Sequence, residues 1–380
     1  MILSAQSFAG TGVALSGKIG RQKIEPSNCQ FAPCVNGLSL WLQGDCLFET
    51  LMLNLVPRSD IDNDKPAWED DSIVDVAVKS WKNPISFTGS AQRFAPQSRF
   101  IRVIDQQSMF FTNGLKTDTD TDSQDPMKAY SRPDDKSAYQ AVKLNEDKAA
   151  WRDVQTLIAI RVANCKPPES LTFAARLVDE GIIDAATNYC ANVVGLATDQ
   201  GSALLWRHER IPVPITLLDN QSLIERLGSL IRNSENIASA LDSRIWNVAR
   251  YFRVPADRQP NKNEKDDINN LILRLDPRPA YWAQLEKHFL RLLEELPNDW
   301  DEHSKDWKTD DQQSATRAWR KNIKREAERA LQESIRSLGT TARAIQAVAR
   351  VRTDFNDNDL SPVIQKVSKL KSKGKGGKKK

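Results

Sequence analysis

The sequence predicts an α+β protein, with an irregular mixed α/β domain over residues 1–218 and a four-helix bundle over residues 219–355. Up to about residue 215, short apolar runs alternate with glycine, proline, asparagine and aspartate, which is typical of strands, turns and brief helices. Beyond that point, the apolar residues recur at steps of three and four, which is the period of helices with one buried face. Residues 356–380 are predicted to form a basic, disordered tail.

The first helix of the bundle is predicted over residues 222–252, where leucine, isoleucine and valine share one face. Ser222 and Glu225 have the spacing of a capping box, in which each side chain bonds a free backbone N–H of the first turn. The polar segments 253–267 and 297–313 are expected to be exposed loops.

Three further helices complete the predicted bundle. The second spans residues 279–296 and has a proline in its first turn, where proline is tolerated. The third spans residues 314–338, and Gly339 suits its C-terminal cap. The fourth runs from a threonine cap, Thr340 or Thr341, to about residue 351. Four successive amphipathic helices can bury their apolar faces against one another.

The net charge of +4 is unevenly distributed. Residues 366–380 hold eight lysines and no acidic residue, and subtracting them from +4 leaves −4 for the rest of the chain. A low-complexity tail of this kind cannot form a core. It either attracts polyanions without reading their sequence or only solubilises the protein, and the composition leaves both alternatives open.

The composition argues against several classes of protein. The apolar runs are far shorter than the roughly 20 residues of a membrane helix, and no basic segment precedes an apolar one at the N-terminus, so we expect a cytoplasmic protein without a signal peptide. The five cysteines and three histidines show no metal-binding spacing, and no glycine-rich nucleotide motif occurs. We therefore expect no metal, no cofactor and no catalytic residues.

Basic residues gather in the third and fourth predicted helices, where acidic residues are few. Between Ala315 and Arg352, only Glu326, Glu328 and Glu333 oppose them. A positive helix face can hold the phosphate backbone of a nucleic acid by counterion release. A solvated face with intrahelical ion pairs is equally compatible with the pattern. The predicted phosphate contacts are Arg320, Lys321, Lys324, Arg329, Arg336, Arg343 and Arg350.

Six segments, each weakly diagnostic alone, follow one another in a characteristic order. They are LFETLMLNLVP (47–57), KPAWE (65–69), APQSRFIR (95–102), DPMKAY (125–130), WRD (151–153) and GLATDQGSALLWRHER (195–210). Their joint order and spacing resemble the CasA family, the large subunit of the type I-E CRISPR Cascade complex. The resemblance runs from about residue 4 to residue 350. The C-terminal half of that family is a four-helix bundle, which agrees with the helical periodicity.

The resemblance implies a subunit of a crRNA-guided complex that has no catalytic chemistry. Such a subunit would check the protospacer-adjacent motif (PAM), open the target duplex, stabilise the R-loop and recruit the helicase-nuclease, while the guide reads the sequence. The implied partners are the backbone, Cas-five-type and small subunits, the crRNA and target DNA, and the helicase-nuclease, with no membrane. The alternative is a purely structural subunit, with PAM reading done by another chain.

Family members read the PAM with a glycine-containing loop, a lysine finger and a polar wedge. Lys116 is the best match to the lysine finger, because a flexible ammonium group can reach base acceptors in a groove, and an ordinary hairpin-turn lysine is the alternative. The wedge would fall near residues 178–180, which lack an amide side chain. The second candidates are Thr198, Asp199 and Gln200 at a predicted hairpin tip, with a plain turn as the alternative. Gln97 and Arg99 complete the predicted PAM-proximal set.

The resemblance also implies that much of the usual N-terminal domain, with its glycine loop, has no counterpart in this sequence. Three explanations remain open: a compact variant with relaxed motif reading, a second polypeptide that supplies the missing part, or a transfer of this role to another subunit.

Overall fold

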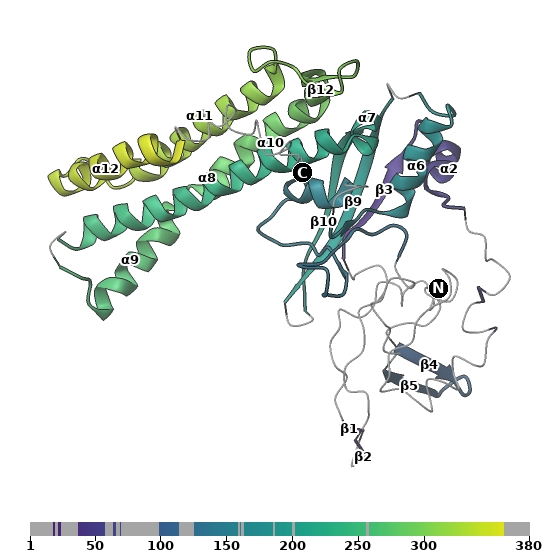
Figure 1. Ribbon diagram of the computed structural model, residues 1–380. Coiled ribbons are helices and arrows are strands. Elements are labelled where there is room, and N and C mark those ends of the chain that lie inside the picture. Colours follow the sequence, from purple (N-terminus) through teal and green to yellow (C-terminus); the bar gives the residue numbers. More distant parts are fainter. Residues whose placement is uncertain are drawn as a thin grey trace, which may run out of the picture. The chain divides into compact units, whose positions relative to one another are not determined.

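The computed structural model of the protein (Figure 1) describes residues 37–57, 99–113, 125–158, 163–184, 187–199, 202–255 and 258–360, together with positions 18–19, 22–23, 64–65, 69 and 160. The chain divides into two compact units, Met1–Glu225 and Arg226–Lys380. The first unit contains small antiparallel sheets and short helices, and the second is mainly helical. The predicted α+β class is therefore confirmed.

A three-stranded antiparallel sheet organises the first unit. Its strands are β3 (Ser39–Gln43), β9 (Asn188–Asp199) and β10 (Ser202–Pro214), in the order β10-β9-β3. Because side chains alternate across a strand, one face of the sheet can be apolar and buried. That face carries Leu38, Leu40, Leu42, Ala191, Val193, Ile211 and Val213. Gly195 lies on this face, where an added Cβ would come within 2.5 Å of Leu38 Cδ2.

Short helices complete the core of the first unit. Helix α2 (Leu47–Asn54) is tied to β3 by Asn54, whose side chain bonds both the N–H and the carbonyl of Leu42, at 2.9 and 2.7 Å. Helix α6 (Glu169–Asp179) lies against α2 and β3. The segment formed by η2 (Ala150–Asp153) and α5 (Val154–Ile158) buries Trp151 and Leu157. Helix α7 (Ile215–Asp219) follows β10 directly.

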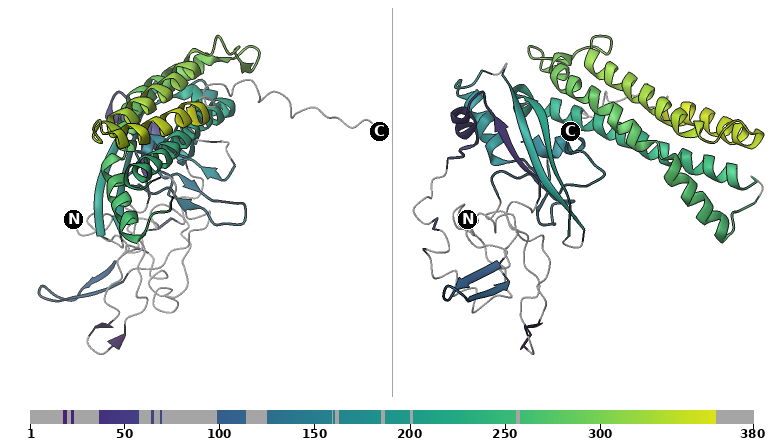
Figure 2. Two further views of the ribbon diagram at one scale, coloured as in Figure 1. Left: turned by 90° about the vertical axis from the view of Figure 1, so that its left-hand side faces the viewer. Right: turned by 180° about the vertical axis from the view of Figure 1, so that it is seen from behind.

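The remaining strands of the first unit are short. Strand β6 (Tyr130–Ser131) pairs with β7 (Gln140–Ala141) and with β8 (Cys165–Lys166). Strands β4 (Arg99–Val103) and β5 (Met109–Asn113) form one hairpin, and β1 (Lys18–Ile19) pairs with β2 (Gln22–Lys23). Figure 2 shows these elements from two further sides.

The four helices predicted for the C-terminal half are present. They are α8 (Gln221–Arg253), α10 (Arg278–Glu295), α11 (Ser314–Arg336) and α12 (Ala342–Asp354). The predicted caps at the α11–α12 junction are confirmed as well. Gly339 has φ +74°, which glycine adopts without strain, and Thr341 Oγ1 accepts a hydrogen bond from Ala344 N at 3.2 Å.

Buried aromatic residues join three of these helices. The indole of Trp319 on α11 donates to the Leu230 carbonyl of α8 at 3.3 Å and meets Phe289 of α10 edge-on, with ring centroids 6.4 Å apart. The hydroxyl of Tyr281 on α10 donates to the Ser234 carbonyl of α8 at 3.2 Å. Each large side chain therefore buries its apolar surface and satisfies its polar atom across a helix contact.

A fifth helix corrects the predicted loop over residues 253–267. Helix α9 spans Lys262–Leu275, so the second half of that segment is helical. It begins with a full capping box, because Asn261 Oδ1 accepts from Glu264 N at 2.9 Å and Glu264 Oε2 accepts from Asn261 N at 2.9 Å. Ile268, Leu271 and Leu275 then bury one face at helical spacing.

Three other boundaries differ from the prediction. The N-cap of α8 is Asn220, whose Oδ1 accepts from Leu223 N at 3.1 Å, and not Ser222. Segment 297–313 contains the hairpin of β11 (Trp300–Asp301) and β12 (Asp306–Trp307), preceded by the 3-10 turn η3 (Leu296–Asp299), and Asp299 is fully buried. The tail does not begin at residue 356, because η4 (Phe355–Leu360) buries Leu360 and joins Asp359 to Arg244 at 2.7 Å.

The structure contains, in its described part, no helix long and apolar enough to cross a membrane.

Candidate nucleic-acid interface

The exposed side of α11 and α12 carries most of the predicted phosphate contacts. Lys321, Lys324, Arg329 and Arg336 on α11 are all exposed, and so are Arg343 and Arg350 on α12. At about 100° per residue, the four α11 positions occupy less than half of the helix circumference. They form one basic strip, opposite the buried face that holds Trp319, Ile323 and Ala327.

Acidic residues neutralise part of this basic strip. Lys324 pairs with Glu328 at 3.8 Å and Arg329 pairs with Glu333 at 2.9 Å, both between residues four apart on the same helix. The hydrogen bond with Glu333 raises the pKa of Arg329 further, so this side chain stays charged. In the described part of the chain, no carboxylate forms an ion pair with Lys321, Arg336 or Arg343. These three are the cations best placed to release counterions on binding phosphate.

Arg320 does not belong to the basic strip. Only 9% of its surface is exposed, and it lies one turn from Thr316 and Ile323 on the buried face of α11. Burial lowers the pKa of its guanidinium, the neighbouring charge of Arg226 lowers it further, and Asp310 acts in the opposite direction. Its Nε is buried without a hydrogen-bond partner. The prediction that Arg320 contacts phosphate is therefore wrong. It rested on the basic side chain alone, whereas the helical period places residue 320 on the buried side of α11.

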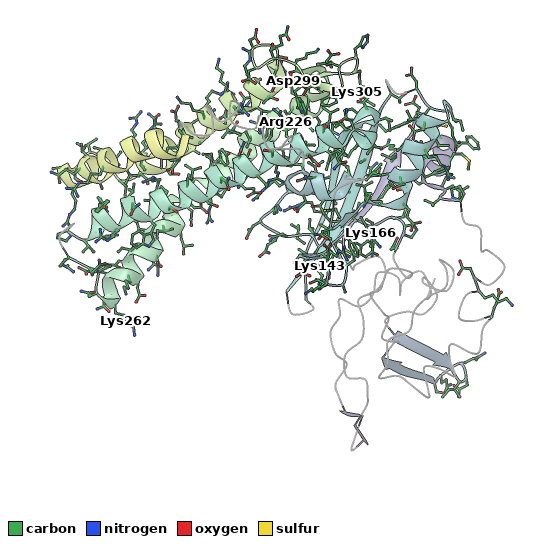
Figure 3. The ribbon with its side chains drawn as sticks, viewed as in Figure 1. Lys143, Lys166, Arg226, Lys262, Asp299 and Lys305 are labelled. Atoms are coloured by element: carbon green, nitrogen blue, oxygen red, sulfur yellow. The ribbon has the colours of Figure 1, made fainter. Side chains whose placement is uncertain are left out.

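A buried polar cluster around Arg226 and Asp299 fixes the start of α11 (Figure 3). The two carboxylate oxygens of Asp299 accept from the backbone N–H groups of Ala315 at 3.1 Å and Thr316 at 2.8 Å, so Asp299 caps α11 from outside the helix. Arg226 Nη1 donates to Gln313 Oε1 at 3.1 Å, and its guanidinium lies 4.1 Å from the centroid of the Trp307 ring. The cluster positions the basic strip by holding the first turn of α11.

Arg350 contacts an aromatic ring as well as solvent. Its guanidinium lies over the ring of Tyr251 on α8, 5.5 Å from the centroid. This cation–π contact joins α12 to α8 and leaves the charge at the surface. Arg350 can therefore stabilise the helix pair whether or not it meets a phosphate.

Three of the six predicted PAM-proximal residues, Lys116, Gln97 and Gln200, lie outside the described residues. Arg99 begins β4, where it pairs with Asn113 of β5. Thr198 and Asp199 end β9, and Asp199 pairs with Ser202, so the predicted hairpin is present. Arg99 and the Thr198–Asp199 pair thus belong to different sheets.

The described residues contain no group of three or more histidine, cysteine, aspartate or glutamate side chains that could hold a metal ion. The three cysteines in the described part are free thiols.

The segment near the expected wedge is the end of α6, followed by Gly181 at φ +70° and by Ile182, which is 66% exposed. This end of α6 carries no amide side chain that could separate base pairs by hydrogen bonding.

A family model for the CRISPR-associated protein Cse1 matches residues 1–330. The chain belongs to this family. The Cse1 or CasA family is the large, non-catalytic subunit of type I-E CRISPR Cascade complexes, as the sequence resemblance implied.

Individual Cse1 relatives are distant in sequence. The CasA/Cse1 protein of Thermus thermophilus is 25% identical over 364 residues, which cover 93% of this chain and 66% of the relative. The crystal structure of Thermus thermophilus CasA is similar with a TM-score of 0.69 and 23% identity, over 93% of this chain and 69% of that one. A chain of a CRISPR RNA-guided surveillance complex is similar with a TM-score of 0.58 and 15% identity, over 93% and 66%. The two structures establish the shared fold, and this chain spans about two thirds of the length of these relatives.

Sequence reasoning missed a second polar surface of this Cse1 chain, on the sheet of the first unit. Trp206, His208 and Arg210 alternate along β10 and all three are exposed. The alternation is visible in the sequence, since every second residue of a strand points to the same side.

Proposed function

We propose that this chain is the non-catalytic large subunit of a crRNA-guided type I-E Cascade surveillance complex in antiviral defence. In this role it binds target DNA near the PAM, promotes duplex opening, stabilises the R-loop and recruits the helicase-nuclease. Its partners are the backbone, Cas-five-type and small subunits, the crRNA and target DNA, and the helicase-nuclease. Membership of the Cse1 family and the likeness to a chain of a surveillance complex support this role.

The observation that carries the DNA-binding part of the proposal is the basic strip of α11 and α12. We infer that α8, α10, α11 and α12 form a four-helix bundle and that the strip runs along its exposed side. Lysine and arginine side chains in a row bind the phosphate backbone without reading bases. Lys321, Arg336 and Arg343 contribute most to phosphate binding, because no ion pair with a described carboxylate has to break before they contact a phosphate. Lys324, Arg329 and Arg350 contribute less, and Arg320 only supports the helix from inside.

The PAM-reading part of the proposal rests on the family resemblance. Lys116 would act as the lysine finger, with Gln97, Arg99, Thr198, Asp199 and Gln200 near the first base pairs of the target. Lysine and amide side chains can donate to base edges in a groove, which is the chemistry that such reading requires.

The test replaces three cations together, as Lys321→Gln, Arg336→Gln and Arg343→Gln. Each lost phosphate contact lowers the slope of log K against log salt by about 0.9, so the triple variant should lose roughly 2.7 from the slope for duplex DNA. The matched control is Lys262→Gln, Lys265→Gln and Arg274→Gln, which removes three exposed charges from α9. Loading of the guide should be intact in both variants. Equal slopes for the two triples would refute the strip as a DNA contact.

A purely structural subunit is the second candidate. The intrahelical pairs Lys324–Glu328 and Arg329–Glu333 favour it, since a merely solvated helix face shows the same arrangement. This candidate predicts normal assembly of the complex and unchanged DNA affinity in the triple variant, so the same experiment separates the two.

A further inference from the structure

The central sheet of the first unit has a second face, which we call the open face. Side chains opposite the apolar core come from all three strands. The open face comprises Trp41 and Gln43 of β3, Cys190, Asn192, Val194 and Leu196 of β9, and Trp206, His208 and Arg210 of β10. The strand register places Asn192 between Trp41 and Arg210 in one row.

The two faces of this sheet differ most in exposure along β10, whereas Asn192 and Leu196 in the centre of the open face are buried, at 4% and 6%. On the core face, Leu40, Val193 and Ile211 are at most 3% exposed. On the open face, Trp206 is 47% exposed, and His208 and Arg210 are exposed as well. Tryptophan exposes a large apolar ring at this position, and such rings on a surface mark recognition sites when polar groups surround them.

A network of neutral side chains orders the open face. The ring of Trp41 stacks on His208, with centroids 6.3 Å apart and an interplanar angle of 12°. His208 Nε2 lies 2.8 Å from Asn192 Oδ1, and Asn192 Nδ2 donates to Gln43 Oε1 at 3.1 Å. These contacts hold the rings in fixed orientations before any ligand arrives, which lowers the entropy cost of binding.

The charge of the open face is positive. Arg210 Nη2 donates to Gln43 Oε1 at 3.3 Å and its Nε to Cys190 Sγ at 3.3 Å, both uncharged partners. No aspartate or glutamate occupies a described position on this face. Glu209 lies on the other side of β10, where it accepts from Ala150 N at 2.8 Å. On that side Glu209 is paired with Arg207 at 3.6 Å, whereas Arg210 has no acidic neighbour on the open side of β10.

We propose that the open face is a stacking platform for the unpaired bases of a single-stranded nucleic acid. Every base has a π-face, so exposed aromatic rings bind single strands with little sequence preference. Trp206 would take one base, the ordered Trp41–His208 pair another, and Arg210 the adjacent phosphate. Trp206 and His208 are two residues apart on one strand, roughly 6.7 Å, so the two bases would be successive. A protein partner fits this face less well, because Leu196 is only 6% exposed and Val194 is half-buried, so the face offers little accessible apolar surface besides the rings.

The proposal goes beyond the proposed function, because it concerns unpaired bases and a different part of the chain from the basic strip. Its signature is also different. Loss of a stacked base lowers affinity without changing the number of phosphate contacts, so the salt slope is unchanged, whereas loss of a phosphate contact lowers the slope. Failure of one can therefore be told from failure of the other.

The test uses the full chain and a fluorescein-labelled 20-nucleotide oligothymidylate, with affinity measured by fluorescence anisotropy at several salt concentrations. Trp206→Ala should weaken binding by at least about five-fold, the lower limit for one lost base–aromatic stack, with an unchanged salt slope. Trp206→Phe should retain most of the affinity, because it keeps a ring. Trp246→Ala is the matched control, because Trp246 is 45% exposed but lies on α8, and it should bind as the unmodified chain does.

Three outcomes would overturn the platform. In the first, Trp206→Ala and Trp246→Ala weaken binding equally. In the second, Trp206→Ala changes the salt slope and does not lower the affinity uniformly across the salt series. Unchanged oligothymidylate binding by Trp206→Ala, together with poorer incorporation into the guide-loaded complex, would make the open face a protein-docking surface. A thermal melt of each variant verifies folding. If the alanine variant is unstable, Trp206→Leu, which keeps apolar volume but has no ring, replaces it and should show the same loss of affinity.

Discussion

The basic strip on α11 and α12 and the open face of sheet β10-β9-β3 are both positive surfaces, but they are built differently. On the helices, cations repeat along an exposed side and two of them are paired with glutamates four residues away. On the open face of the sheet, Arg210 accompanies Trp206 and a stacked pair of Trp41 and His208, and His208 is bonded to the amide of Asn192. A row of flexible charges suits a phosphate backbone, and fixed rings suit bases. The two proposals thus assign different kinds of contact to the two units of this Cse1 chain.

The two surfaces also depend on different supports, which can be removed separately. The helical surface depends on a buried carboxylate that caps α11, and the sheet depends on the close packing of the Leu38 side chain against Gly195. Each support lies away from the surface that it holds. Variants at these positions therefore separate stability from binding.

The largest effect is expected at Asp299. Asp299→Ala leaves two backbone N–H groups of α11 without their acceptor and removes a negative charge near Arg226, and should lower the free energy of unfolding by about 3 kcal/mol. Urea unfolding followed by circular dichroism measures the loss. Asp301→Ala is the control, since Asp301 only bonds His303 and Ser304 in an exposed turn, and should cost less than about 1 kcal/mol. Similar losses in both variants would contradict the capping role.

Gly195 should give the next largest effect. A Cβ at this position would come within 2.5 Å of Leu38 Cδ2 and 3.2 Å of Leu144 Cβ, so Gly195→Ala should destabilise the protein by about 2 kcal/mol through overpacking. The cost should shrink in a Leu38→Ala background, where the clashing methyl group is absent. Additive losses in the double-mutant cycle would show that steric conflict with Leu38 is not the cause.

Tyr189, near the start of the central strand β9, predicts a pH dependence of stability. Burial, followed by the hydrogen bond from the Tyr189 hydroxyl to Glu49 Oε1 at 3.0 Å and the charges of Glu49 and Asp45, raises the pKa of Tyr189 from 10.0 to about 12. A raised pKa in the folded state means that the contribution to stability is present below pH 10.0 and is lost as the pH rises through about 12. Tyr189→Phe should remove this part of the alkaline loss. Parallel unfolding curves of both proteins over this pH range would disprove it.

The smallest effect is expected from Glu333. Glu333→Gln releases Arg329 from an exposed ion pair worth at most about 1 kcal/mol, so duplex affinity should rise by less than about five-fold at low salt. Stability should change by no more than about 0.5 kcal/mol. Glu294→Gln, on the exposed side of α10, is the control and should leave affinity unchanged. A rise in affinity in both variants would point to overall charge rather than to the basic strip.

Helical periodicity in the sequence was sufficient to find α8, α10, α11 and α12, because each buries one continuous apolar face. Helix α9 was missed although Ile268, Leu271 and Leu275 carry the same spacing, since its polar first turn resembles a loop. The capping box of Asn261 and Glu264 was the signal that would have revealed it.

The candidate site was predictable in type but not in detail. Counting basic residues identified the strip on α11, whereas only the helical phase shows that Arg320 lies inside. The role of Asp299 could not be predicted, because its carboxylate caps a helix that begins many residues later and the contact exists only after folding. The open face was within reach of the sequence through the alternation of Trp206, His208 and Arg210.

Binding of duplex DNA by the guide-loaded complex, with and without this chain, tests the central claim most directly. The targets should share one protospacer and differ only in the flanking motif, with the Lys321, Arg336 and Arg343 triple variant measured beside the unmodified chain. We predict that the chain raises affinity for one flank over the others and that the triple variant loses affinity for all flanks equally. An unchanged affinity for every flank when the chain is added would contradict the account.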